Sequence, residues 1–135
     1  MPRARWSSLA TPESVGEIRQ AVVDFAWAHG ITDARANDLG LAVSEAVTNA
    51  VVHAYRRHAQ PGGVNVSATV DGPWMEVRVV DDRSGMAPRT DSPGLGLGLH
   101  LIYRLADQVE LRARPDGPGT ELWMHCRMSK PTDTR

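Results

Sequence analysis

Cysteine is almost absent from this sequence, and Cys126 is the single example in 135 residues. One cysteine excludes an intrachain disulfide and a metal site built from several thiolates, and it fits a reducing compartment. A lone free cysteine usually behaves as a small buried apolar residue. We therefore predict that Cys126 lies in the core.

An excess of one charge and a long apolar run are also missing. The 15 basic and 16 acidic side chains nearly cancel, so no overall field would draw the chain onto nucleic acid or an anionic membrane. No run of ~18 apolar residues occurs, which argues against a signal peptide or a membrane span. We expect a cytoplasmic protein whose ligand is a small molecule or another protein.

Hydrophobic periodicity divides the chain into helices and hairpins. Helical spacing of apolar residues predicts helices over 11–30, 32–55 and 99–106. Alternation of apolar and polar residues predicts hairpins over 64–79 and 109–126. The glycine-rich and proline-rich segment 83–98 is predicted to be a loop, and the polar ends 1–5 and 128–135 are predicted to be frayed.

This order of elements indicates the fold class. Strands joined by tight turns cannot be parallel, so the sheet should be mixed and mostly antiparallel, with the helices gathered on one face. The predicted fold is a two-layer α+β sandwich. Its length and its 41% hydrophobic content suit a single domain, which spans 1–135 and has its core at about 11–127.

The second predicted helix carries a polar row, Glu45, Asn49 and His53, with one member every four residues. The row fits the solvated back of an amphipathic helix, but between Asp38 and Tyr55 the only charged side chain is Glu45, and exposed faces usually carry several. A Glu beside an Asn also suits a magnesium–phosphate site, with the amide oxygen as metal ligand and the carboxylate as proton acceptor. His53 can instead cap the last carbonyls of the helix.

An acidic strand end is the second candidate. An apolar strand runs directly into Asp81 and Asp82, and Gly85 follows. A buried carboxylate there can accept a hydrogen bond from an exocyclic amine such as that of adenine, and glycine allows the backbone to approach the ring. The alternative is an ordinary surface turn, in which Asp is common.

The third candidate is a glycine loop, Gly94, Gly96 and Gly98, ahead of the third helix. Unobstructed N–H groups and the positive end of a helix dipole can hold polyphosphate without lysine. The segment is neither a P-loop nor a dinucleotide fingerprint. A flexible hinge is the alternative.

Taken in order, these three segments resemble the N, G1 and G2 boxes of the Bergerat-fold, histidine-kinase-like ATPases. They are most similar to the free-standing anti-sigma factor serine kinases. The resemblance covers about 11–127 and includes Gly119-Thr120 at the start of the last strand. It implies a homodimeric enzyme that uses ATP and Mg²⁺ to phosphorylate a serine of an anti-anti-sigma protein, and that holds a sigma factor as its other partner.

The resemblance also implies roles for the matched residues. Glu45 would be the general base for the serine hydroxyl, Asn49 would hold magnesium against the ATP phosphates, and Asp81 would receive the adenine amine. Gly85 would pack beside the base and Thr120 would support Asp81 or the ring. The three residues of the glycine loop would line the lid and the phosphates.

One position departs from the family pattern. The G1 box is usually Asp-x-Gly-x-Gly, and Arg83 stands here in place of its first glycine. If that glycine needs positive φ, arginine would cost about 1–3 kcal/mol of local strain, which corresponds to roughly 5- to 150-fold in ATP affinity. The lid over 86–94 is short, and Arg89 is its candidate phosphate contact.

Arg83 therefore motivates an alternative function. The chain would then be a non-catalytic switch that binds a regulatory protein and holds ATP weakly or not at all. A third option is the detached ATPase domain of a histidine kinase, which is disfavoured because no phosphoacceptor helix pair precedes the domain.

Overall fold

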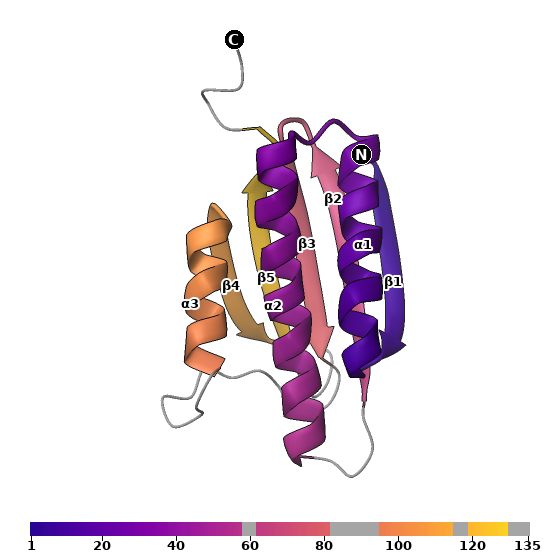
Figure 1. Cartoon of the computed structure of the whole chain (residues 1–135), viewed down its shortest axis with the longest axis vertical. Helices are drawn as coiled ribbons and strands as arrows, with labels where there is room; N and C mark the ends of the chain where they lie inside the picture. The colour runs from indigo at the N-terminus through magenta and orange to yellow at the C-terminus, as the bar shows by residue number, and fades with distance from the viewer. Residues whose placement is uncertain (58–61, 82–94, 115–118, 130–135) are drawn as a thin grey trace.

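The computed structural model describes residues 1–57, 62–81, 95–114 and 119–129, and within them the side chains of all but 53–57 and 95–99. Three helices and five strands lie in these ranges, in two layers (Figure 1). In chain order they are β1 (Arg3–Leu9), α1 (Pro12–Ala28), α2 (Asp33–Arg57), β2 (Gly63–Asp71), β3 (Trp74–Asp81), α3 (Leu95–Leu105), β4 (Gln108–Ala113) and β5 (Thr120–Arg127).

The strands form one sheet in the order β1-β2-β3-β5-β4, and every neighbouring pair is antiparallel. After β3 the chain leaves the sheet, forms α3, makes the edge strand β4 and returns as β5 between β3 and β4. The three helices cover one face of the sheet (Figure 1). The predicted two-layer α+β sandwich is confirmed.

The prediction of a frayed amino terminus is wrong, because β1 is a paired edge strand. Its register runs from Arg3 opposite Thr69 to Leu9 opposite Gly63. Trp6 anchors it on the helical side, with its ring 6.0 Å from that of Phe25 in an edge-to-face arrangement. A single inward aromatic among polar residues is a weak periodic pattern, and this edge strand was missed for that reason.

The first two helices begin and end close to their predicted limits. Ser14 and Thr11 bond reciprocally at the start of α1, where the Ser14 hydroxyl donates to the Thr11 carbonyl at 2.6 Å and accepts from the Thr11 N–H at 3.3 Å. Gly30, with φ +96°, follows the end of this helix. The Thr32 carbonyl accepts the first bond of α2, from the Ala36 N–H at 2.8 Å.

The third helix begins earlier than predicted. α3 starts at Leu95, so Gly96 and Gly98 lie in its first turns and not in a loop. Glycine is about 1 kcal/mol less favourable than alanine in a helix interior, and that penalty moved the predicted start to residue 99. The loop prediction is wrong for 95–98, and the rest of the predicted loop, 83–94, lies outside the described residues.

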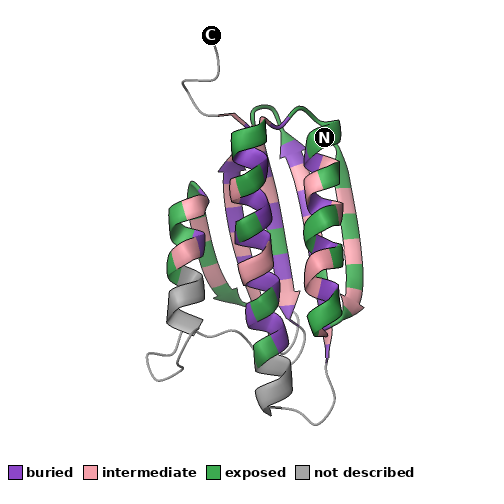
Figure 2. Cartoon of the chain, viewed as in Figure 1, coloured by how far each residue is buried: buried purple, intermediate pink, exposed green. Residues whose placement is uncertain are grey.

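The core lies between the helices and the inner face of the sheet (Figure 2). Val43 and Val47 of α2 are fully buried, as are Val77 and Val79 of β3. Cys126 of β5 is 3% exposed, which confirms it as a core residue. Burial raises the pKa of its thiol to about 12.

Candidate functional site

Three of the predicted site residues are buried polar residues. Among the described residues only five polar or charged side chains are buried, and Asn49, Asp81 and Thr120 are three of them, at 6%, 3% and 7% exposure. Burying a polar group costs free energy unless it finds a partner. Polar groups that are buried at such a cost are typical of a binding site.

Asp81 and Thr120 lie side by side on neighbouring strands. Asp81 is the last residue of β3, Thr120 is the first of β5, and the two stand directly opposite each other in the antiparallel register. Directly opposed side chains on one face of a sheet have Cβ atoms about 5 Å apart. Both face the helices, because the alternation along each strand places them with the buried Val79 and Leu122.

Asn49 projects from α2 on the buried side of the helix, and its Nδ2 atom has no hydrogen-bond partner among the described residues. An unsatisfied buried polar group costs about 1–3 kcal/mol. A bound group would remove that cost. Rotation of the carboxamide would present its oxygen at the same position, where a hard cation such as Mg²⁺ can take it.

The solvated-back interpretation of the polar row is wrong for Asn49 and does not fit Glu45, which is half-buried. The exposed face of α2 carries Leu41, Thr48 and Val52 instead. The side chain of His53 lies outside the described residues, so its predicted capping role stays a prediction. One wall of the helix that holds Glu45 and Asn49 thus turns away from bulk solvent.

These residues come to one end of the molecule. In Figure 1 the end of β3, the start of β5, the carboxyl-terminal half of α2 and the start of α3 all lie at the lower end. α2 also contacts β3 and β5 directly. The structure therefore brings the elements that carry Asn49, Asp81 and Thr120 together, as a common pocket requires.

The amino-terminal turns of α3 face the same end. The first four N–H groups of a helix have no acceptor within the helix, and the helix dipole makes that end positive. Gly96 and Gly98 lie in this part of α3, and neither carries a side chain of its own. Gly85, Gly94, Arg83 and Arg89 lie outside the described residues.

Two surface hollows formed by described residues lie elsewhere. A hollow of about 440 Å³ on the outer face of the sheet is lined by Arg5, Arg78 and Arg114 among others, and one of about 350 Å³ lies between α1 and α2. Neither is lined by a predicted site residue. Within the described part of the chain, no three His, Cys, Asp or Glu side chains are grouped to hold a metal.

No helix in the described ranges is long and apolar enough to cross a membrane.

Sequence comparison finds a family and named relatives. The profile of the histidine kinase-like ATPase domain matches residues 9–126. The serine-protein kinase RsbW of Bacillus pumilus is 36% identical over 121 residues, which cover 77% of this chain and 74% of the relative. The RsbW of Bacillus subtilis is 36% identical over 118 residues, covering 76% and 73%. The anti-sigma F factor of Clostridium acetobutylicum is 29% identical over 127 residues, covering 86% and 87%.

Structure comparison supports the same fold. The crystal structure of the RsbU and RsbW domains of Rv1364c from Mycobacterium tuberculosis superposes with a TM-score of 0.74 over 97% of this chain, at 22% sequence identity. The matched region is 34% of that longer chain. At this identity the likeness establishes the fold alone.

Proposed function

The chain belongs to the histidine kinase-like ATPase domain family, as the resemblance of its three motifs indicated, and from this premise we propose that it is an ATP-dependent protein serine kinase and anti-sigma factor. Its substrate would be a serine of an anti-anti-sigma protein, and its other partner a sigma factor. The relatives named as serine-protein kinases and as an anti-sigma factor support this choice of partners. We place it in the cytoplasm, where ATP is supplied.

The observation that carries the proposal is the set of buried polar groups at one end of the fold. Asp81 would accept a hydrogen bond from the adenine amine, and Thr120, directly opposite, would orient the carboxylate or the ring. Gly85 would allow the base to approach. Asn49, whose buried carboxamide lacks a partner for Nδ2 among the described residues, would bind Mg²⁺ and so fix the phosphates.

The chemistry assigned to the chain itself is a proton transfer. Bound ATP and Mg²⁺ would supply the phosphoryl group and neutralise its charge. Glu45 lies one helical turn before Asn49, and residues four apart share a side of the helix. Its half-buried carboxylate would take the proton of the substrate serine hydroxyl. The N–H groups at the start of α3, with Gly94, Gly96 and Gly98, would line the phosphates.

A homodimer is part of the proposal, and the outer face of the sheet supports it. On this face the His125 ring stacks on Trp74 at 4.4 Å and lies 5.3 Å from Trp123. Arg127 and Arg112 lie over the two indole rings. The helices cover the opposite face (Figure 1), so a second copy is the partner we assign to this aromatic surface.

The kinase proposal is tested by phosphate transfer. The purified chain is incubated with labelled ATP, Mg²⁺ and candidate anti-anti-sigma proteins, and phosphoserine is measured. Glu45→Ala should abolish transfer and leave nucleotide binding intact. Thr48→Ala, an exposed change in the same helix, should keep both. Failure of the wild-type chain to phosphorylate any such partner would overturn the proposal.

The second candidate function, a protein-binding switch without catalysis, is motivated by Arg83 in the G1 box. Calorimetric titration with ATP and Mg²⁺ separates the two. A dissociation constant beyond the millimolar range would favour the switch, and a tighter one the kinase.

A further inference from the structure

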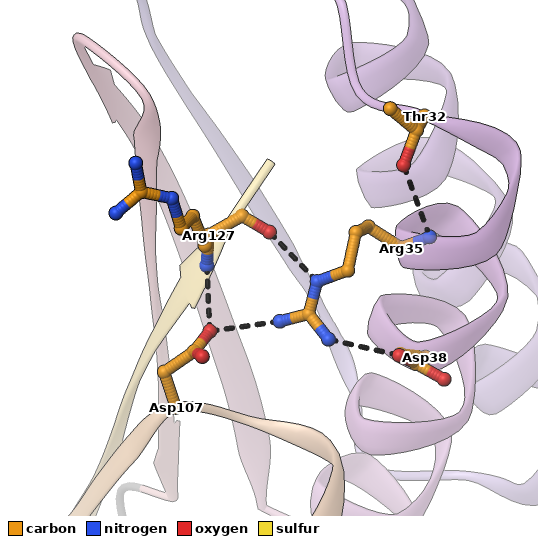
Figure 3. A network of polar contacts seen from close by, with 5 residues as sticks. All are labelled: Thr32, Arg35, Asp38, Asp107 and Arg127. Carbon is orange, nitrogen blue, oxygen red and sulfur yellow. Dashed lines mark hydrogen bonds and ion pairs between the residues drawn. The ribbon is translucent and has the colours of Figure 1, made fainter. Parts of the chain in front are cut away.

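A buried arginine joins three elements at the end of the fold opposite the candidate site. We call Arg35 and its partners Asp38, Asp107 and Arg127 the Arg35 network (Figure 3). The Arg35 side chain is 9% exposed. Nε donates to the Arg127 carbonyl, Nη1 to Asp38 and Nη2 to Asp107, each at 2.8 Å. Sequence reasoning missed this network, because its partners lie up to 92 residues apart.

Asp107 is the member that ties α3 to the rest of the fold. It follows α3 by two residues, just before β4. Its Oδ2 atom accepts from Arg35 and also from the Arg127 N–H at 2.7 Å, and its own N–H donates to the His125 carbonyl at 3.0 Å. The carboxyl-terminal end of α3 is thus connected to α2 by the Arg35 side chain and to β5 by the backbone groups of His125 and Arg127.

The described side chains of α3, residues 100–105, bury little apolar surface. Of its described side chains, Ile102 alone is buried, Leu101 and Leu105 are half-buried, and Tyr103 is 56% exposed. α3 packs mainly on α2. The two helices run in opposite directions (Figure 1), so the Arg35 network closes one end of the pair while the amino-terminal turns of α3 lie at the other.

Because the Arg35 network holds α3 at one end, the orientation of the helix at that end sets the position of the other end. A helix of 11 residues is about 16 Å long. A small rotation of α3 about its carboxyl-terminal end therefore moves its amino-terminal turns, which contain Gly96 and Gly98, farther than the residues near the pivot. Asn49 lies on α2, fourteen residues beyond Arg35 in the numbering of the chain. The angle between α2 and α3 therefore sets how far the N–H groups of α3 lie from the groups on α2.

We propose that the bond between Arg35 and Asp107 is a positioning contact, which holds α3 at the angle that phosphate binding requires. The inference rests on the proposed nucleotide site, and it adds two residues that touch no substrate. Asp38 serves as the natural contrast, because its bond to Arg35 lies within α2 and does not reach α3.

The single cysteine provides a reporter that is independent of activity. Cys126 precedes Arg127 on β5 and is 3% exposed. Both chain neighbours of Cys126 bond to Asp107: the His125 carbonyl accepts from its N–H, and the Arg127 N–H donates to its Oδ2 atom. Cys126 therefore lies next to the network. Opening of the network would expose it to a thiol reagent such as 5,5′-dithiobis(2-nitrobenzoate).

The test compares Asp107→Asn with the matched control Asp38→Asn, well below the unfolding temperature of each. Asparagine at position 107 can still accept a hydrogen bond, but it removes the negative charge that pairs with the buried Arg35, and this should weaken Mg-ATP binding about tenfold in Asp107→Asn. The control should stay within about threefold. Thiol labelling of native Asp107→Asn should also become at least about tenfold faster, by the same reasoning.

Arg35→Lys is a second variant, since lysine keeps the charge but cannot reach three acceptors in fixed geometry. It should behave like Asp107→Asn. If both variants are folded, melt at a lower temperature and still bind Mg-ATP like the wild type, the network is structural only and the inference is overturned.

The inference and the proposed function fail in different ways. If the wild-type chain does not bind ATP, the proposed function fails, and the network is judged by amide hydrogen exchange in α3. Faster exchange in Asp107→Asn than in Asp38→Asn supports the anchoring role, and equal exchange overturns it.

Discussion

Replacing Asn49 by alanine should make the protein more stable and remove nucleotide binding. The buried Nδ2 atom has no partner in the described part of the chain, so removing it should recover about 1–3 kcal/mol. Alanine also gains up to about 0.7 kcal/mol of helix propensity over asparagine. Lost apolar contacts should offset about 1 kcal/mol. The net expectation is a gain of about 1–2 kcal/mol, which raises Tm by about 4–7 °C for a chain of this size.

The assay is urea unfolding with and without Mg-ATP, and Thr48→Ala is the control. Threonine and asparagine have similar helix propensities, and Thr48 is exposed, so the control measures the propensity gain alone. Nucleotide at 100 times its dissociation constant stabilises a binding-competent chain by about 2.7 kcal/mol. This increment should appear in the wild type and in Thr48→Ala, and should be missing in Asn49→Ala.

Two results would refute the reasoning. If Asn49→Ala unfolds at least about 1 kcal/mol more easily than the wild type, the carboxamide is satisfied within the protein and stabilises the fold. If Asn49→Ala keeps the full increment from Mg-ATP, the residue does not hold the phosphates.

Three further predictions concern the rest of the fold. Burial raises the pKa of the Cys126 thiol from 9.0 to about 12, so above pH 9 the native state keeps a proton that the unfolded state loses. The free energy of unfolding should therefore fall by up to about 1.4 kcal/mol per pH unit above pH 9. Urea unfolding of Cys126→Ala should lack this contribution to the pH dependence. Trp6→Ala should lower the free energy of unfolding by about 2–3 kcal/mol, since the indole anchors β1 on Phe25. Trp27→Ala, at a residue 48% exposed, should lower it by under about 1 kcal/mol. Equal losses in urea unfolding would contradict the anchoring role. Trp123→Ala should shift the proposed homodimer toward monomer in sedimentation velocity, and Thr48→Ala, exposed on α2, should not; an unchanged dimer in Trp123→Ala would exclude the aromatic surface around Trp123 as the interface.

The sequence was sufficient for the elements with strong local patterns. The valines of α2 and the alternating residues of β2, β3, β4 and β5 have repeating signals, and the predicted fold class followed from their order. Asp81 and Thr120 were linked only through the family resemblance, and the register of β3 and β5 now explains why they belong together.

What the sequence concealed depends on contacts across the fold. β1 has one inward aromatic residue, Trp6, and its strand identity comes from pairing with β2. The early start of α3 comes from tertiary context that outweighs the low helix propensity of Gly96 and Gly98. Arg35 reads as an ordinary charged residue in a first turn, and its burial depends on Asp107, which is 72 positions away.

The most direct test of the nucleotide pocket compares ATP with inosine triphosphate. The two share the ribose and the phosphates, but inosine carries a carbonyl oxygen where adenine carries the amine. An ionised carboxylate accepts hydrogen bonds but cannot donate one, so Asp81 should favour the amine of adenine over the carbonyl oxygen of inosine. Calorimetric titration in Mg²⁺ should give ATP binding at least about tenfold tighter, because a site built to hydrogen-bond one group rejects an analogue that lacks it. Equal affinities, or no binding of either nucleotide, would contradict the account.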